Sequence, residues 1–158
     1  MARMDKPTFP IAVVMQRRSL QSRWADHAWE PAGVLAGFAE ERAPRVLRED
    51  PELSQWLHPG FVLVLHKDEA EGYYFNVSSQ NPRVFILWRM DDDVGVPVEV
   101  TVSFDEAGRW MDGGHSVDSV PMLPEIFAWV GDWVEHNYRP KPEVRIKPRS
   151  FVHPKDRV

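Results

Sequence analysis

A carboxylate and an imidazole separated by two glycines are the clearest candidates for chemistry in this chain. They form the run Asp112, Gly113, Gly114 and His115, and such a pair can act as a general acid and base or as half of a metal site. The same residues also fit the end of a helix, with Gly113 in the left-handed turn that follows and His115 in a polar loop. The second interpretation is favoured, because no third catalytic or ligating group stands at a characteristic spacing from them.

A second acid and imidazole pair, Asp26 and His27, lies between the tryptophans Trp24 and Trp29. Adjacent residues of an extended chain point to opposite faces, so these two side chains are not expected to form a catalytic dyad. Aromatic residues in loops often contribute a large share of the binding energy at protein interfaces. Core packing is the favoured interpretation for each tryptophan taken singly, but at least one exposed aromatic patch is expected among them. Trp24, Asp26, His27 and Trp29 are therefore candidate contacts with a protein partner.

Other patterns of catalysis and metal binding are absent from the sequence. There is no cysteine, which excludes disulfides, thiol nucleophiles, iron–sulfur clusters and thiolate zinc sites. No serine stands in a Gly-x-Ser-x-Gly motif. The consecutive carboxylates Asp91, Asp92 and Asp93 lack the spacing of a calcium loop and predict a solvated hairpin turn. The sequence thus predicts a protein that is not an enzyme and has no metal site and no cofactor.

Charge is distributed unevenly along the 158 residues. The net charge is -5, yet residues 139–158 hold seven Lys or Arg against Glu143 and Asp156, together with four prolines. We predict one domain at residues 1–138 and a basic tail at residues 139–158, which either solubilises the chain or contacts an acidic protein surface. Nucleic acid is a poorer candidate, because the acidic body would repel phosphate. The candidate contact residues of the tail are Arg139, Lys141, Arg145, Lys147 and Arg149.

The elements that would position these residues are mostly short strands. We predict strands at residues 10–20, 28–38 with a bulge, 45–47, 61–65, 73–77, 84–88 and 96–104. One helical turn is predicted from Asp50 through Leu57, ended by Pro59 and Gly60. The connections are too short for parallel crossovers, so the strands are expected to be antiparallel.

Two helices are predicted after the strands. Asp105 would cap a short helix that ends at Met111, and Pro124 would begin an amphipathic helix that Pro140 ends. The predicted fold is α+β, with an antiparallel sheet or partly open barrel of six to seven strands followed by a short helix and a C-terminal amphipathic helix. A pleckstrin-homology-like barrel is the alternative. No stretch reaches the roughly 20 apolar residues of a membrane span, and no signal peptide is recognised, so a cytoplasmic protein is expected.

Six segments together carry a family resemblance. They are residues 13–20 (VVMQRRSL), 24–31 (WADHAWEP), 65–76 (LHKDEAEGYYFN), 84–90 (VFILWRM), 111–114 (MDGG) and 120–129 (VPMLPEIFAW). From about residue 10 to residue 142, the chain resembles an uncharacterised proteobacterial family of unknown function, domain-of-unknown-function family 3305. The resemblance implies a genomic context beside formate dehydrogenase and molybdenum-cofactor genes.

That context implies an accessory role. We expect a non-catalytic protein that binds a protein partner in the assembly or operation of a molybdenum-dependent formate dehydrogenase, the partner being the enzyme itself or a maturation factor. The alternative is an enzyme or a protein that binds a small ligand or metal, with a pocket near Asp112 and His115.

Overall fold

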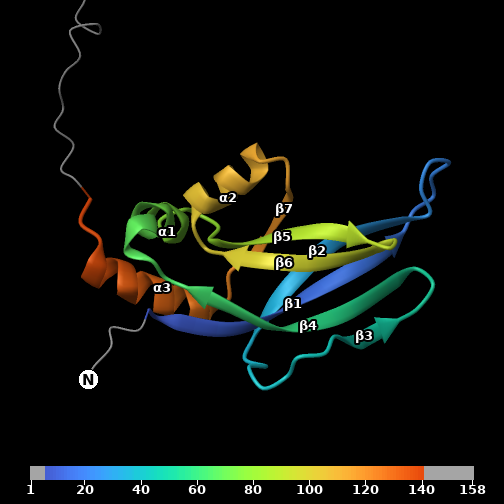
Figure 1. Ribbon diagram of the computed structural model, residues 1–158, viewed down its shortest axis with the longest axis horizontal. Helices are drawn as coiled ribbons and strands as arrows, with labels where there is room; N and C mark the ends of the chain where they lie inside the picture. Colours follow the sequence, from blue (N-terminus) through green and yellow to red (C-terminus); the bar gives the residue numbers. More distant parts are fainter. Residues whose placement is uncertain (1–5, 141–158) are drawn as a thin grey trace, which may run out of the picture.

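Two antiparallel sheets form the body of the computed structural model, which describes residues 6–140 (Figure 1). The first sheet has the order β2-β1-β4-β3 and contains β1 (Thr8–Ser19), β2 (His27–Ala36), β3 (Arg45–Glu49) and β4 (Leu53–Val64). The second has the order β6-β5-β7 and contains β5 (Arg83–Asp91), β6 (Val94–Thr101) and β7 (Ser116–Pro121). The α+β prediction is confirmed. Within residues 6–140 the sheets do not close into a barrel, so the pleckstrin-homology-like alternative is wrong.

The helices gather toward one end of the molecule (Figure 1). A 3-10 turn, η1 (Lys67–Glu69), leads into α1 (Ala70–Val77), and α2 (Phe104–Asp112) and α3 (Pro124–Asn137) follow β6 and β7. The two predicted helices are confirmed as α2 and α3, and Pro124 occupies the first turn of α3 as expected. The cap of α2 is Ser103 and not Asp105, because the Ser103 hydroxyl accepts the Glu106 N–H at 3.1 Å.

The hydrophobic core lies between the two sheets and the helices α1 and α3. Strand β5 is covered on both faces, since its four consecutive residues 84–87 are all buried, as their continuous apolar run predicts. Tyr73 of α1 and one face of α3 cover the core at the helical end, and the Tyr73 side chain is 1% exposed. Its fully buried members include Ile11, Val13, Met15, Leu63, Val84, Ile86, Ile126 and Val130.

The helical turn predicted from Asp50 through Leu57 is wrong, because most of this segment belongs to the strand β4. Pro59 and Gly60 do not end an element, because they occupy a bulge in β4. The register on β1 shifts between Ile11, which faces Phe61, and Val13, which faces His58. Gly60 has a φ of 88°, a backbone conformation open to glycine and unfavourable for other residues.

Residues 73–77, predicted as a strand, belong to the helix α1, and this prediction is also wrong. The helix places Gly72, Tyr73 and Asn76 on the buried side. The Asn76 amide, which is 0% exposed, donates to the carbonyls of Arg83 and Val102 at 2.7 and 2.8 Å and accepts the Arg83 N–H at 2.9 Å. These tertiary hydrogen bonds outweigh the strand preference of the neighbouring aromatic residues. Strand β7 was not predicted at all.

Candidate functional sites

Three hairpin turns project from the end of the molecule opposite α1 and α3, and we call this the hairpin end (Figure 1). They connect β1 to β2, β3 to β4, and β5 to β6. The first two are joined at their base, where the Ser19 N–H donates to the Glu52 carbonyl at 2.9 Å. The third contains Asp92 and Asp93, with φ of 47° and 65°, which is the geometry of a tight hairpin turn. The predicted hairpin turn at Asp91 to Asp93 is therefore confirmed.

The β1–β2 hairpin carries the most exposed large apolar side chain among the described residues, Trp24, at 91% exposure. Its backbone is held by a bond from the Trp24 N–H to the Ser22 hydroxyl at 3.1 Å. Asp26 and His27 are exposed on the same hairpin, where the Asp26 carbonyl accepts the Leu20 N–H at 2.8 Å. The hairpin thus presents the three predicted contact residues Trp24, Asp26 and His27 to solvent.

Trp29, the fourth predicted contact residue of this segment, lies in β2 and packs behind the hairpin. Its ring centroid is 5.1 Å from that of Trp56 in β4, and the guanidinium of Arg17 in β1 lies 5.9 and 5.6 Å from the two centroids. Gly95 of β6 faces the same indole, since a Cβ added there would come within 2.8 Å of the Trp29 Cβ. Trp29 therefore joins β1, β2, β4 and β6 at the base of the hairpin end.

A row of polar and charged side chains on the outer face of the first sheet links β1, β2 and β4 near the hairpin end. Gln55 donates to Gln16 at 3.0 Å, Gln16 donates to Glu30 at 2.6 Å, and Arg18 pairs with Glu30 at 2.5 Å. The bond from Arg18 lowers the pKa of Glu30 below its usual range. Next to this row of side chains lies a shallow hollow of about 490 Å³, lined by Arg18, Ser19, Gln21, Arg48, Glu52 and Leu53.

The predicted acid and imidazole pair at residues 112–115 lies away from the hairpin end, in the connection from α2 to β7 (Figure 1). Asp112, Gly113, Gly114 and His115 are all exposed. The left-handed residue after α2 is Gly114, with a φ of 84°, and not Gly113. The structure does not bring Asp112 and His115 together with Asp26 and His27.

Of the five tail residues predicted to contact a partner, only Arg139 falls within the described part of the chain. It is exposed, and its guanidinium donates to the Glu135 carbonyl at 2.7 Å, at the end of α3. Lys141, Arg145, Lys147 and Arg149 lie outside the described residues.

A cavity that the sequence analysis missed lies at the opposite, helical end. It has a volume of about 630 Å³ and is walled by the residues before β1, the β4–η1 junction and the last turn of α3. At its edge the Lys6 Nζ is 2.8 Å from the His66 Nδ1. No local pattern could have found this cavity, because Lys6, His66 and Trp133 are far apart in the chain.

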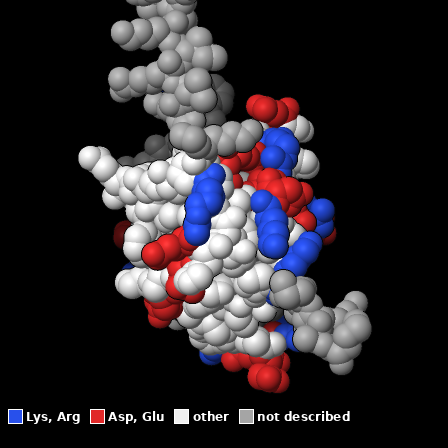
Figure 2. Space-filling model, turned by 90° about the vertical axis from the view of Figure 1, so that its left-hand side faces the viewer, with Lys and Arg blue, Asp and Glu red and all other residues white. Residues whose placement is uncertain are grey.

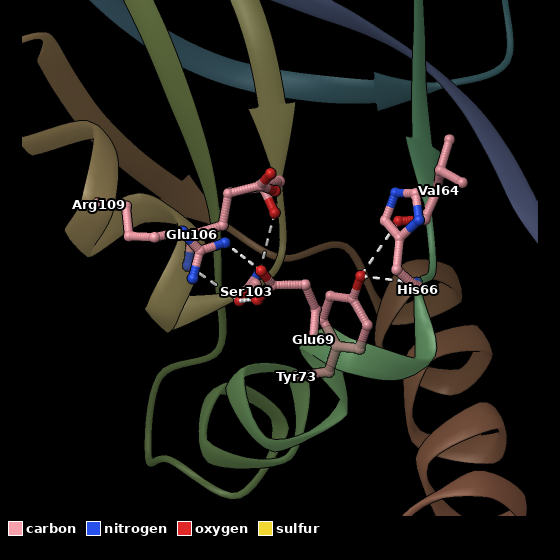
Figure 3. A network of polar contacts seen from close by, with 8 residues as sticks. Val64, His66, Glu69, Tyr73, Ser103, Glu106 and Arg109 are labelled. Carbon is pink, nitrogen blue, oxygen red and sulfur yellow. Dashed lines mark hydrogen bonds and ion pairs between the residues drawn. The ribbon is translucent and has the colours of Figure 1, made fainter. Parts of the chain in front are cut away.

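A network of polar contacts fixes the backbone of His66 and the start of α1 (Figure 3). The Tyr73 hydroxyl accepts the His66 N–H at 2.9 Å and donates to the Val64 carbonyl at 3.3 Å. Glu69 accepts the Ser103 hydroxyl at 2.7 Å and pairs with Arg109 of α2. Burial raises the pKa of Tyr73 to about 12, so this phenol stays neutral and both of its hydrogen-bonding roles are used inside the fold.

His66 also borders a second, more open cavity of about 410 Å³, which includes Glu99, Glu106 and Trp110. Within residues 6–140, no group of three His, Asp or Glu side chains is arranged to hold a metal ion. Near His66, the side chains of Lys6, Tyr73 and Glu69 are engaged in hydrogen bonds or ion pairs, whereas Lys67 and Asp68 line the first cavity and Glu99 and Glu106 the second.

The fold and these sites define a small α+β domain with a projecting hairpin end and a cavity at its helical end. The family model described as "Protein of unknown function (DUF3305)" matches residues 10–147, and the chain belongs to this family. No curated protein and no solved structure matches the chain. In the part of the chain that the structure describes, no helix has the length and apolar character needed to cross a membrane.

Proposed function

We propose that this protein is a cytoplasmic, non-catalytic accessory protein that binds a protein partner through its hairpin end. The observation that carries the proposal is the exposure of Trp24, at 91%. An indole buries about 200 Å² when it is covered. At about 25 cal/mol per Å², covering Trp24 would contribute at most about 5 kcal/mol to association. That is the size of contribution that a central interface residue makes.

The surroundings of Trp24 support the same assignment. The hairpin is anchored by the packing of Trp29, Trp56 and Arg17, so the indole projects from a rigid base. Exposed polar residues such as Arg23, Asp26 and His27 surround it. An apolar residue within a polar rim is the usual composition of a protein interface.

For the partner, we propose the formate dehydrogenase enzyme or one of its maturation factors. This rests on the family resemblance, which implies a role in the assembly or operation of a molybdenum-dependent formate dehydrogenase. The basic residues 139–158 would supply a second contact with an acidic surface of that partner. The alternative function, an enzyme with a pocket near Asp112 and His115, gains no support from the geometry, since both residues are exposed.

Affinity capture of the tagged protein from its native host, grown with molybdate and formate, tests the proposal. Formate dehydrogenase subunits or maturation factors are expected among the captured proteins. The variant Trp24→Ala should bind the captured partner at least about 30-fold more weakly, the loss typical of a central interface residue. Phe127→Ala is the matched control, because Phe127 is an exposed aromatic of α3, at 44% exposure.

Circular dichroism of both variants verifies that they remain folded. Capture of no formate dehydrogenase component would refute the proposed partner. Equal affinity of the wild-type protein and Trp24→Ala would refute the proposed binding surface.

A further inference from the structure

The cavity at the helical end, which we call the Lys6 cavity, has the dimensions of a small-ligand site. Its volume of about 630 Å³ lies within the range of about 300–1,000 Å³ that such sites occupy. Its walls come from three separate parts of the chain, residues 6–7, residues 65–68 and the last turn of α3. Because these parts are held together by the fold itself, the cavity exists without a ligand.

The floor of the Lys6 cavity is apolar and rigid. Leu65 is 1% exposed and belongs to the main core. Trp133 makes an edge contact with Tyr73, with ring centroids 5.5 Å apart and an interplanar angle of 80°. Tyr73 is itself 1% exposed and hydrogen-bonded on both sides. An apolar group that entered the cavity would therefore meet mainly the Trp133 indole and Pro7, because Leu65 beneath them exposes almost no surface.

The rim of the Lys6 cavity carries an excess of one positive charge. Lys6 and Lys67 line it together with a single carboxylate, Asp68. The Lys6 ammonium donates one hydrogen to the His66 Nδ1 at 2.8 Å, which requires this nitrogen to be unprotonated. Two ammonium hydrogens of Lys6 are left for other acceptors. A ligand with one negative charge would therefore neutralise the net charge of Lys6, Lys67 and Asp68. Figure 2, which views the molecule from this end, shows basic and acidic side chains close together on one side of an uncharged surface, with further charged side chains on its other side.

We propose that the Lys6 cavity binds a small monocarboxylate with an aromatic or branched apolar body. The carboxylate would lie against Lys6 and Lys67, and the apolar body against Pro7 and Trp133. A dianion such as a phosphate monoester fits less well. Asp68 and the partial negative charge of the C-terminal turn of α3 repel any anion, and they repel a dianion more strongly, because its second negative charge is not balanced by Lys6 and Lys67. This site is built on α3 and the residues before β1, whereas Trp24 lies in the β1–β2 hairpin, so the proposal does not depend on the proposed function.

Titration of the full chain with benzoate and with 4-methylpentanoate, followed by ¹H–¹⁵N correlation spectra, tests this proposal. Both probes are expected to shift the Trp133 indole N–H and the amides of residues 66–68 in a saturable way, with a Kd of about 1 mM or lower. Benzamide, which has the shape of benzoate without its charge, should bind at least about tenfold more weakly.

The variant Lys6→Met keeps an unbranched apolar side chain of nearly the same length and removes the charge, and it should weaken benzoate binding by about tenfold or more. Arg89→Met is the matched control, since Arg89 is an exposed basic residue of β5 that does not line the Lys6 cavity, and it should bind benzoate like the wild-type protein. Three results would each overturn the proposal: no saturable shift with either carboxylate at about 20 mM, equal affinity for benzamide, or unchanged affinity in Lys6→Met.

Discussion

The Ser103 hydroxyl makes two hydrogen bonds, one that caps α2 and one that ties it to η1, and the variant Ser103→Ala tests how much they stabilise the fold. The side chain is 0% exposed. Its hydroxyl accepts the Glu106 N–H at 3.1 Å and donates to the Glu69 carboxylate at 2.7 Å. Loss of a helix cap costs about 1 kcal/mol. Loss of a hydrogen bond to a charged group costs about 1.5–3 kcal/mol, and the Glu69 side chain is only 13% exposed. We therefore expect a loss of about 2–4 kcal/mol in the free energy of unfolding.

Urea unfolding at neutral pH, followed by circular dichroism and tryptophan fluorescence, measures this loss. A thermal scan should show the midpoint of Ser103→Ala lower by about 5–15 °C. The double-mutant cycle with Glu69→Ala, which removes the acceptor, isolates the contact between these two side chains, and it should give a coupling energy of about 1 kcal/mol or more. Ser116→Ala is the control, because Ser116 is exposed, and it should change stability by less than about 0.5 kcal/mol. A loss below about 0.5 kcal/mol in Ser103→Ala, or a coupling energy near zero, would refute this reasoning.

Two further predictions concern packing and protonation. In Gly95→Ala the new Cβ would lie 2.8 Å from the Trp29 Cβ, so we expect urea unfolding to show a loss of about 1–3 kcal/mol. Gly108→Ala, which meets nothing within 4 Å, should be neutral or stabilising, and equal effects of the two substitutions would contradict the packing argument. Burial lowers the pKa of His58 in the folded protein below its ordinary 6.5. As the pH falls below 6.5, the unfolded chain therefore binds a proton at His58 before the folded protein does, and the folded protein loses stability. The stability of the wild-type protein relative to His58→Asn should therefore decrease between about pH 7.5 and pH 5.5, and a constant difference would contradict it.

Strands with strong local patterns could be predicted from the sequence, and elements decided by distant contacts could not. The apolar run of β5 and the spacing in α3 each indicate one structure. The aromatic run Tyr73, Tyr74 and Phe75 favours a strand locally. It forms a helix because Gly72 allows α1 to approach Ser103, where an added Cβ would come within 2.2 Å of the Ser103 Oγ. Strand β7 has only two apolar branched residues, Val117 and Val120, too few for a recognisable pattern.

The same distinction applies to the candidate sites. Trp24 could be identified as a candidate contact residue from a local feature, a polar turn between two strands, although its 91% exposure is known only from the structure. The stacking of Trp29 on Trp56 depends on the pairing of β1 with both β2 and β4, which the sequence does not reveal. The Lys6 cavity could not be predicted, because its walls meet only after the two sheets and α3 have assembled.

Strand β1 connects the two ends of the molecule. It leaves the Lys6 cavity at Thr8 and reaches the β1–β2 hairpin at Ser19, with neighbours on both sides and with residues 11–15 buried along its middle. At about 3.3 Å per residue, its twelve residues separate the two surfaces by roughly 40 Å. The contact at Trp24 and a carboxylate at Lys6 would therefore not overlap. Any influence of one on the other through the domain would be an allosteric coupling transmitted through this strand and its neighbours.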